Sequence, residues 1–216
     1  MLNKSEGKKR IAVLVSGGGT NLQALIDEER KNGLGGGEIV LVVSSKPDVY
    51  ALERAKAHGI KAITLARREY KDTSEYSRAL ADLLVSEEID LVVLAGFLTI
   101  IGEEMYEKFE NRIINVHPAL IPAFSGKGYY GLFVHEAALK KGVKVSGATV
   151  HFVTPECDAG PIILQKAVEV LEGDTPEVLQ RRIMENAEWK ILPEAVRLFC
   201  SDRLSVVDGK VKIKGE

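Results

Sequence analysis

The sequence Ile11-Ala-Val-Leu-Val15, Ser16-Gly-Gly-Gly19, Thr20-Asn-Leu-Gln-Ala-Leu-Ile26 decides the fold class. Its first part is a short apolar run typical of a buried strand, and in its last part the apolar residues have helical spacing. The glycines between them predict a tight turn. Thr20, with Gln23 shortly after it, is expected to form a capping box at the helix start. We therefore expect a strand, a turn and a helix in succession.

The same alternation continues through the first half of the chain. Further apolar runs predict strands, and segments with helical spacing lie between them. The predicted strands are Ile39 to Val43, Ala62 to Leu65, Leu91 to Ala95 and Ile113 to Val116, and the predicted helices are Leu52 to His58 and Tyr76 to Glu87. Buried strands that alternate with helices indicate a parallel sheet with helices on both faces. The expected fold class is α/β, with a doubly wound, mostly parallel sheet.

The second half of the chain has a different pattern. A long connection rich in proline and glycine runs from Pro118 to Gly131, and a predicted helix, Val134 to Lys141, follows it. Two extended runs, Val145 to Val153 and Ile162 to Val170, are separated by a turn that contains proline and glycine. We expect these two runs to pair as a hairpin, which gives the sheet an antiparallel C-terminal part.

The chain is expected to end with a helix and a small hairpin. Asp174 and Glu177 look like a second capping box, at the start of a helix that runs to about Phe199. Asp208-Gly209, between alternating residues, predicts a type I′ hairpin turn. Because no linker, repeat or change of composition divides the sequence, we expect one domain over residues 1–216.

Composition and charge exclude several classes of protein. The chain has 216 residues, 45% of them hydrophobic, and 29 Lys and Arg against 31 Asp and Glu. This balance gives no basic surface for nucleic acid, and the apolar runs are far shorter than the roughly 18 residues that span a bilayer. Cys157 and Cys200 are far apart and no histidines cluster, so neither a disulfide nor a metal site is expected. The basic start, Lys4 to Arg10, lacks the apolar stretch of an export signal, and we expect a cytoplasmic protein.

The glycine turn has the features of an anion site. Glycines allow backbone N–H groups to approach a ligand closely, and the N-terminus of the following helix favours negative charge. The pattern is not that of a dinucleotide site, because Leu22 stands where the third glycine would be and Ser44-Ser45-Lys46 offers no acidic residue after the second strand. Gly126-Lys127-Gly128 does not lie at a strand-to-helix turn, so it is no P-loop. A phosphate is the expected ligand.

A second candidate site lies at the end of the strand that precedes Pro118. Asn115 and His117 are two residues apart, so in a strand they lie on the same face. An amide and an imidazole together suit addition to a carbonyl group, since the amide stabilises an oxyanion and the imidazole exchanges a proton. Asp158 or Glu156 could supply a carboxylate, which favours the protonated imidazole and relays protons. His151 could line the same cleft, whereas His58 and His135 are expected to be structural.

Four motifs, in this order, resemble the phosphoribosylglycinamide formyltransferase family, the folate-dependent transformylases of purine biosynthesis. They are Ser16-Gly-Gly-Gly-Thr-Asn-Leu-Gln-Ala, Leu94-Ala-Gly-Phe-Leu98, Asn115-Val-His-Pro-Ala-Leu-Ile-Pro122 and Asp158-Ala-Gly-Pro-Ile-Ile-Leu-Gln165. The resemblance extends from Arg10 to the terminal hairpin. It implies a formyltransferase-like variant of the Rossmann fold and transfer of a formyl group from 10-formyltetrahydrofolate to the glycinamide amine of 5′-phosphoribosylglycinamide.

The resemblance also implies the functional residues. The catalytic residues would be Asn115, His117 and Asp158, with the first two at the oxyanion and the third assisting proton transfer. Phosphoribosylglycinamide would contact Gly19, Thr20, Asn21 and Glu188. The folate would contact Leu98, Thr99, Ile100, Ile101, Asn115, Thr154, Pro155, Glu156, Cys157 and Asp158. No metal is implied, and the partners are small molecules, bound by a monomer or a homodimer.

This sequence departs from the family pattern in two places. Some members have an arginine where this chain has Asp72-Thr-Ser74, so Arg67, Arg68 or Lys71 is expected to meet the glutamate tail of the folate. The segment Ser125 to Gly131 is longer than in some members, and it is a candidate lid.

Three other functions are compatible with parts of the pattern. Formyltetrahydrofolate hydrolase and methionyl-tRNA formyltransferase share the Asn, His and Asp set, but each normally carries a second domain, for which we expect no room in this chain. A module that only binds phosphate would use the glycine turn and leave Asn115, His117 and Asp158 without a role.

Overall fold

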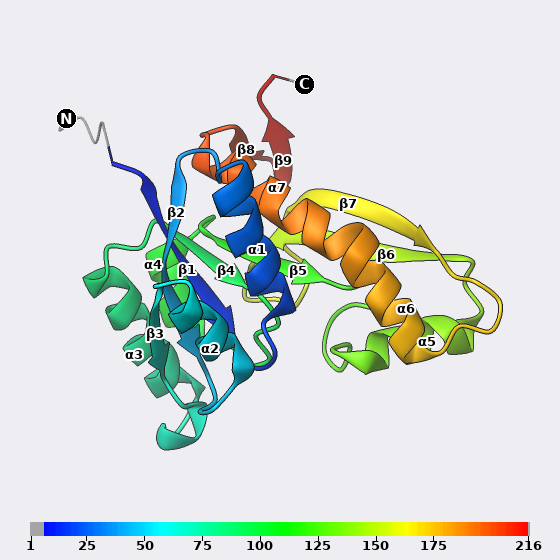
Figure 1. The fold of residues 1–216 in the computed structure, drawn as a ribbon, viewed down its shortest axis with the longest axis horizontal. Coiled ribbons are helices and arrows are strands. Elements are labelled where there is room, and N and C mark those ends of the chain that lie inside the picture. The colour runs from blue at the N-terminus through cyan, green and yellow to red at the C-terminus, as the bar shows by residue number, and fades with distance from the viewer. Residues whose placement is uncertain (1–6, 216) are drawn as a thin grey trace.

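The computed structural model describes residues 7–215 and contains a seven-stranded sheet with the order β3-β2-β1-β4-β5-β6-β7 (Figure 1). Its strands are β1 Lys9–Val15, β2 Gly37–Ser44, β3 Lys61–Thr64, β4 Leu91–Leu94, β5 Ile113–His117, β6 Val145–Phe152 and β7 Ile162–Glu169. The helices are α1 Thr20–Lys31, α2 Tyr50–Ala57, α3 Thr73–Ser86, α4 Glu103–Phe109, α5 Leu132–Lys141, α6 Pro176–Ile183 and α7 Trp189–Cys200, with a 3-10 turn at Arg67–Glu69. A two-stranded sheet follows, β8 Leu204–Val207 and β9 Lys210–Ile213.

The direction of the strands confirms the predicted fold class. Strands β1 to β5 are parallel to one another, whereas β6 is antiparallel to both β5 and β7. The predicted hairpin of β6 and β7 therefore forms and extends the parallel sheet at one edge. The small C-terminal hairpin also forms, and positive φ angles of 50° at Asp208 and 69° at Gly209 are those that a type I′ turn requires.

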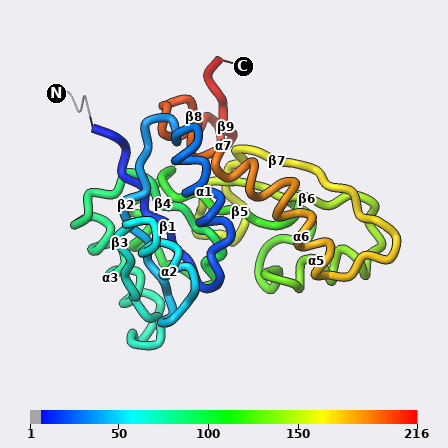
Figure 2. Tube along the Cα trace, viewed as in Figure 1, coloured from blue at the N-terminus to red at the C-terminus, as the bar shows by residue number. Residues whose placement is uncertain are grey.

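Helices cover both faces of the sheet because consecutive side chains of a strand point to opposite faces. On β1, Ile11, Val13 and Val15 join a core with α1, α2, α6 and α7, and Ala12 and Leu14 join a second core with α3 and α4. Helices α1 and α7 contact each other over the first of these faces (Figure 2). None of the helices in residues 7–215 has the length and apolar character needed to cross a bilayer.

Both predicted capping boxes are wrong. The N-cap of α1 is Gly19, in the left-handed region at φ 73° and ψ 36°, and Thr20 is already helical. A threonine would be strained in that conformation, so the chain uses a glycine and no side-chain cap. At α6 the N-cap is Thr175, whose hydroxyl accepts a hydrogen bond from Val178 N. Asp174 instead accepts from Leu171 N and pairs with Arg182.

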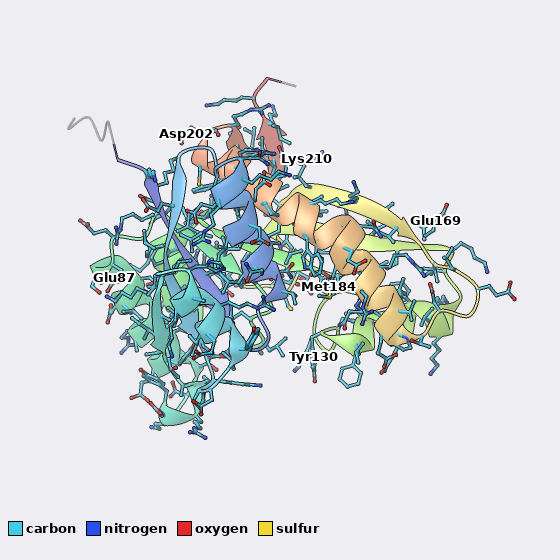
Figure 3. The ribbon with its side chains drawn as sticks, viewed as in Figure 1. Glu87, Tyr130, Glu169, Met184, Asp202 and Lys210 are labelled. Atoms are coloured by element: carbon cyan, nitrogen blue, oxygen red, sulfur yellow. The ribbon has the colours of Figure 1, made fainter. Side chains whose placement is uncertain are left out.

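The last predicted helix contains a π-helical segment, and α4 was not predicted at all. Met184–Glu188 forms a π-helix that joins α6 to α7 in one continuous run (Figure 3). Within it Ala187 and Glu188 are both buried. Helix α4, seven residues long, has no side-chain cap at Gly102, which explains the missing sequence signal.

Candidate active site

Pairing of β5 with β6 brings the first two candidate catalytic residues beside a histidine. Asn115 and His117 lie on β5 and are opposite His151 and Thr149 of β6. Residues opposite each other in an antiparallel pair have neighbouring side chains. Asn115 Nδ2 lies 3.2 Å from His151 Nε2. His151 Nδ1 lies 2.8 Å from the carbonyl oxygen of Phe152, which can only accept a hydrogen bond, so Nδ1 carries a proton and Nε2 is the atom that faces Asn115.

Asp158 lies between the two histidines. Its Oδ2 is 3.5 Å from His117 Nδ1, and its Oδ1 is 3.6 Å from His151 Nε2. It also accepts a 2.9 Å hydrogen bond from Gly126 N. Glu156, the other candidate carboxylate, is exposed. The structure therefore brings Asn115, His117 and Asp158 together. His151 lies beside both Asn115 and Asp158, a position that the sequence only suggested.

Burial and hydrogen bonds set the charges in this cluster. Burial raises the pKa of Asp158, but the hydrogen bond with His151, the proximity of His117 and the Gly126 N–H outweigh it and lower that pKa to about 2. Asp158 is therefore ionised at neutral pH. Burial lowers the pKa of His117, although Asp158 and the carbonyl of Phe124 act in the opposite direction. Asp158 thus favours the imidazolium of His117 as expected, but burial has the larger effect.

The position of the proton on His117 follows from its second contact. His117 Nε2 lies 2.8 Å from the carbonyl oxygen of Phe124, which can only accept a hydrogen bond. The Nε2 atom therefore carries the proton, and Nδ1 is the atom that faces Asp158 and can exchange one. The contacts of Phe124 and Gly126 were not predicted, because they are made by backbone atoms that any residue could supply.

The glycine turn lies between β1 and α1, close to the carboxyl ends of β4 and β5. Added Cβ atoms at Gly17 and Gly18 would meet nothing within 4 Å, so the backbone of the turn is open there. A Cβ at Gly19 would lie 2.6 Å from Ala51 Cβ. The open backbone and the N-terminus of α1 together have the properties of a phosphate site.

Two further predicted residues meet beside this turn. Asn21 Nδ2 donates a 2.7 Å hydrogen bond to Glu188 Oε2. Asn21 Oδ1 is buried and has no partner within residues 7–215, so one polar atom remains for a ligand. Burial raises the pKa of Glu188 to about 7, although the bond from Asn21 acts to lower it.

The predicted folate segments lie in loops after β4 and β6. The loop Leu98 to Ile101 is tied to the turn, because Leu98 N donates to Ser16 Oγ at 3.0 Å. Leu98 and Ile100 expose 56% and 76% of their surface, which suits the binding of an apolar ring. The second loop is held by a bond from Thr154 Oγ1 to Glu156 O, and Pro155 and Cys157 in it are exposed.

Two other predictions concern residues outside the cluster. Among the basic candidates for the folate tail, Arg67 is engaged with Tyr70 O and the ring of Tyr76, whereas Arg68 and Lys71 are exposed. His135 is fully buried on α5, and neither ring nitrogen has a partner in the part of the chain that the structure describes.

Comparison with known proteins identifies the family. Residues 9–196 match the family model described as formyl transferase. The chain is 43% identical to a chloroplastic phosphoribosylglycinamide formyltransferase of Arabidopsis thaliana, over 91% of this chain and 67% of that protein. It is 41% identical to the human trifunctional purine biosynthetic protein adenosine-3, over 94% of this chain but only 20% of that protein.

Solved structures agree with the sequence match. The structure of glycinamide ribonucleotide transformylase 1 from Symbiobacterium toebii has a TM-score of 0.90 and 45% identity, and covers 99% of this chain and 98% of its own. A formyltetrahydrofolate deformylase from Pseudomonas syringae has a TM-score of 0.86 and 27% identity, and this chain covers 66% of it. The chain described here belongs to the formyl transferase family.

Proposed function

We propose that this chain transfers a formyl group from 10-formyltetrahydrofolate to the glycinamide amine of 5′-phosphoribosylglycinamide, a step of de novo purine biosynthesis. The observation that carries the proposal is the cluster of Asn115, His117 and Asp158 beside an open glycine turn. The similarity to proteins named for this reaction supports it. A module that only binds phosphate would not need the cluster.

The acceptor would bind through its phosphate at Gly19, Thr20 and Asn21. The N-terminus of α1 and the backbone N–H groups there favour an anion. Glu188, which shares a hydrogen bond with Asn21, would contact the glycinamide part of the same ligand. Its raised pKa leaves the carboxyl partly protonated near neutral pH, so it can donate as well as accept hydrogen bonds.

The folate would lie between the two loops that follow β4 and β6. Leu98, Thr99, Ile100 and Ile101 would form one side, although Ile101 is buried in the core with α3 and α4. Thr154, Pro155, Glu156 and Cys157 would form the other side. The exposed apolar side chains of the first loop fit a pterin ring, and Asn115 and Asp158 at the base of the loops fit its polar edge and formyl group.

The reaction would begin when the neutral amine attacks the formyl carbon. Asn115 has two N–H donors, so it can keep its contact with His151 and stabilise the oxyanion with the other donor. His117 would be the second group at the oxyanion when its Nδ1 is protonated, because Nε2 already donates to the carbonyl of Phe124. The proton of the attacking amine would pass through water to Asp158, the folate nitrogen would leave as the carbon–nitrogen bond breaks, and a proton would return to that nitrogen.

A formyl-transfer assay tests the proposal. The purified chain should form N-formylglycinamide ribonucleotide and tetrahydrofolate in equal amounts when both substrates are present. A parallel reaction without acceptor should leave the folate unchanged. Equal loss of the formyl group with and without acceptor would instead identify a hydrolase.

Several coarser expectations belong to the same proposal. We infer one formyltransferase domain over residues 1–216, a metal-free reaction in the cytoplasm, and a monomer or a homodimer with small molecules as its partners. Sedimentation of the purified chain measures the oligomeric state, and turnover after dialysis against a chelator tests the need for metal.

A further inference from the structure

Helix α2 holds two consecutive carbonyl groups of the glycine turn. Ala51 N donates to Gly17 O at 3.2 Å, and Arg54 Nε donates to Gly18 O at 2.9 Å. The turn is therefore built against α2 as well as at the start of α1. Ala51 also forms the surface that a Cβ at Gly19 would strike, so α2 and the turn are in close contact.

These two bonds fix the direction of the N–H groups in the turn. In a trans peptide, the C=O of one residue and the N–H of the next point in opposite directions. Because Gly17 O and Gly18 O point to α2, the N–H groups of Gly18 and Gly19 point away from it. Consecutive N–H groups directed to one side form a site for an anion.

The peptide between Gly18 and Gly19 needs an external anchor. Neither residue has a side chain, so this peptide unit rotates more easily than one flanked by larger residues. Its carbonyl is held by the side chain of Arg54, which is itself fixed. Arg54 Nη1 donates to Gln23 Oε1 at 2.9 Å, and its guanidinium carbon lies 4.8 Å from the centre of the Tyr50 ring.

We propose that Arg54 is a positioning residue for the acceptor's phosphate. It acts through the Gly18 carbonyl, which keeps the Gly19 N–H directed at the ligand. This inference rests on the proposed function, because it assumes that the turn receives a phosphorylated acceptor. A planar guanidinium can bond to Gly18 and Gln23 at once, whereas an ammonium carries the same charge without this geometry.

Arg54→Gln and Arg54→Lys test the role, with Lys56→Gln as the matched control. Lys56 lies on the same helix and pairs with Glu53. Both Arg54 variants should raise the KM for phosphoribosylglycinamide about tenfold, as expected for loss of a charge-assisted hydrogen bond, with kcat and the folate KM nearly unchanged. The control should behave as the wild type. A wild-type KM in Arg54→Lys would overturn the proposal, because charge alone would then suffice.

The dephosphorylated acceptor separates positioning from general damage. Without a phosphate the direction of the Gly19 N–H no longer matters, so glycinamide riboside should have the same kcat/KM with the wild type and both Arg54 variants. An equal loss for the riboside would show a merely structural role. Should the Arg54 variants fail to fold, Gln23→Ala, which removes one anchor of the guanidinium, should give a smaller rise in the nucleotide KM, and an unchanged KM would contradict the proposal.

Calorimetry with ribose 5-phosphate keeps this inference separate from the proposed reaction. The wild type should bind this probe more tightly than either Arg54 variant, whether or not the chain transfers a formyl group. If the wild type bound the probe but failed to form product, only the proposed function would be wrong. Equal binding by wild type and variants would contradict the role of Arg54.

Discussion

The glycine turn and the cluster around Asp158 lie at the same edge of the sheet but are built in opposite ways. In the turn, the groups available to a ligand are backbone N–H groups, and helix α2 holds their direction through Gly17 O and Gly18 O. In the cluster the functional atoms are side-chain atoms, and backbone groups of Phe124 and Gly126 hold them in place.

The difference predicts how each region responds to substitution. Under the proposed function, truncating a side chain in the cluster removes a reacting group, so the effect should appear in kcat. Adding a side chain in the turn obstructs the backbone, so the effect should appear in the affinity for the acceptor. Three substitutions test this division, and a fourth experiment concerns a buried histidine outside both regions.

The largest effect is expected for Asp158→Asn, which keeps the shape of the side chain and removes its charge. Loss of a proton-transfer group typically costs about 10²–10⁴-fold, and we expect a fall in kcat of this size with little change in either KM. The pKa of His117 should also fall, since Asp158 raises it. Turnover and an NMR titration of His117 measure the two effects.

The matched control is Asp208→Asn, at an exposed turn residue that also has a positive φ. If Asp158→Asn left both turnover and the His117 titration unchanged, Asp158 would only shape its turn. Glu156 would then be the next carboxylate to test.

Asn115→Ala should have the next largest effect. Removing an oxyanion donor typically costs about 10²–10³-fold in kcat, while the fold and the affinity for the nucleotide should remain. The variant also removes the donor that faces His151 Nε2. Steady-state kinetics with both substrates check the prediction, and nearly normal turnover would eliminate Asn115 from the reaction.

Gly19→Val should affect the turn alone. A Cβ here meets Ala51 at 2.6 Å in a left-handed conformation, so the turn must shift. A side chain in the left-handed conformation costs about 1–2 kcal/mol. If this strain is relieved only when the nucleotide is absent, the affinity for the nucleotide falls roughly tenfold, whereas the affinity for folate should not change. Gly35→Val is the control, because that residue also has a positive φ and a close contact, with Ser201. If calorimetry showed that Gly19→Val lowers the affinities for the nucleotide and for folate equally, the division between the two regions would be contradicted.

The smallest effect on turnover is expected at His135, which should influence stability instead. Burial lowers its pKa from 6.5 to about 4, so between these values the folded protein binds fewer protons than the unfolded chain. The contribution of His135 to stability should therefore fall as the pH falls through this window, by about 2 kcal/mol between roughly pH 7 and pH 5, whereas Glu188, whose pKa is raised, contributes in the opposite direction. Denaturant unfolding of the wild type and of His135→Leu at several pH values measures the free energy of unfolding of each protein. The stability of the wild type relative to the variant should fall by this amount between pH 7 and pH 5, because the contributions of His117 and Glu188 are common to both proteins, and equal slopes would exclude His135 as the cause.

The sequence predicted those features that depend on local periodicity. Apolar runs gave the strands, and the two-residue spacing of Asn115 and His117 placed both on one strand. The hairpin of β6 and β7 followed from two extended runs around a Pro and Gly turn. Such patterns are set by the alternation of side chains and need no knowledge of distant contacts.

The sequence could not predict features that depend on backbone conformation. The carbonyl of Phe124 and the N–H of Gly126 reach the cluster only through the path of the connection after β5. The helix α1 begins directly after the glycines as predicted, but its cap was mispredicted, because the left-handed Gly19 stands in place of the expected side-chain cap. No sequence pattern pointed to a role for Arg54, because its partner is the backbone carbonyl of Gly18, a group that every residue possesses.

The π-helical segment Met184–Glu188 has a consequence for reading alignments of this family. A π-turn holds one residue more than an α-helical turn, and such insertions are frequent at functional sites. Deleting one residue here would restore a regular α-helix and leave the apolar faces of α6 and α7 directed at the core. The hydrogen bond between Asn21 and Glu188 would lose its geometry. A single gap at this position in a homologue would therefore mark a change in the proposed acceptor site within an intact helix, and an alignment score that treats all gaps alike would overlook it.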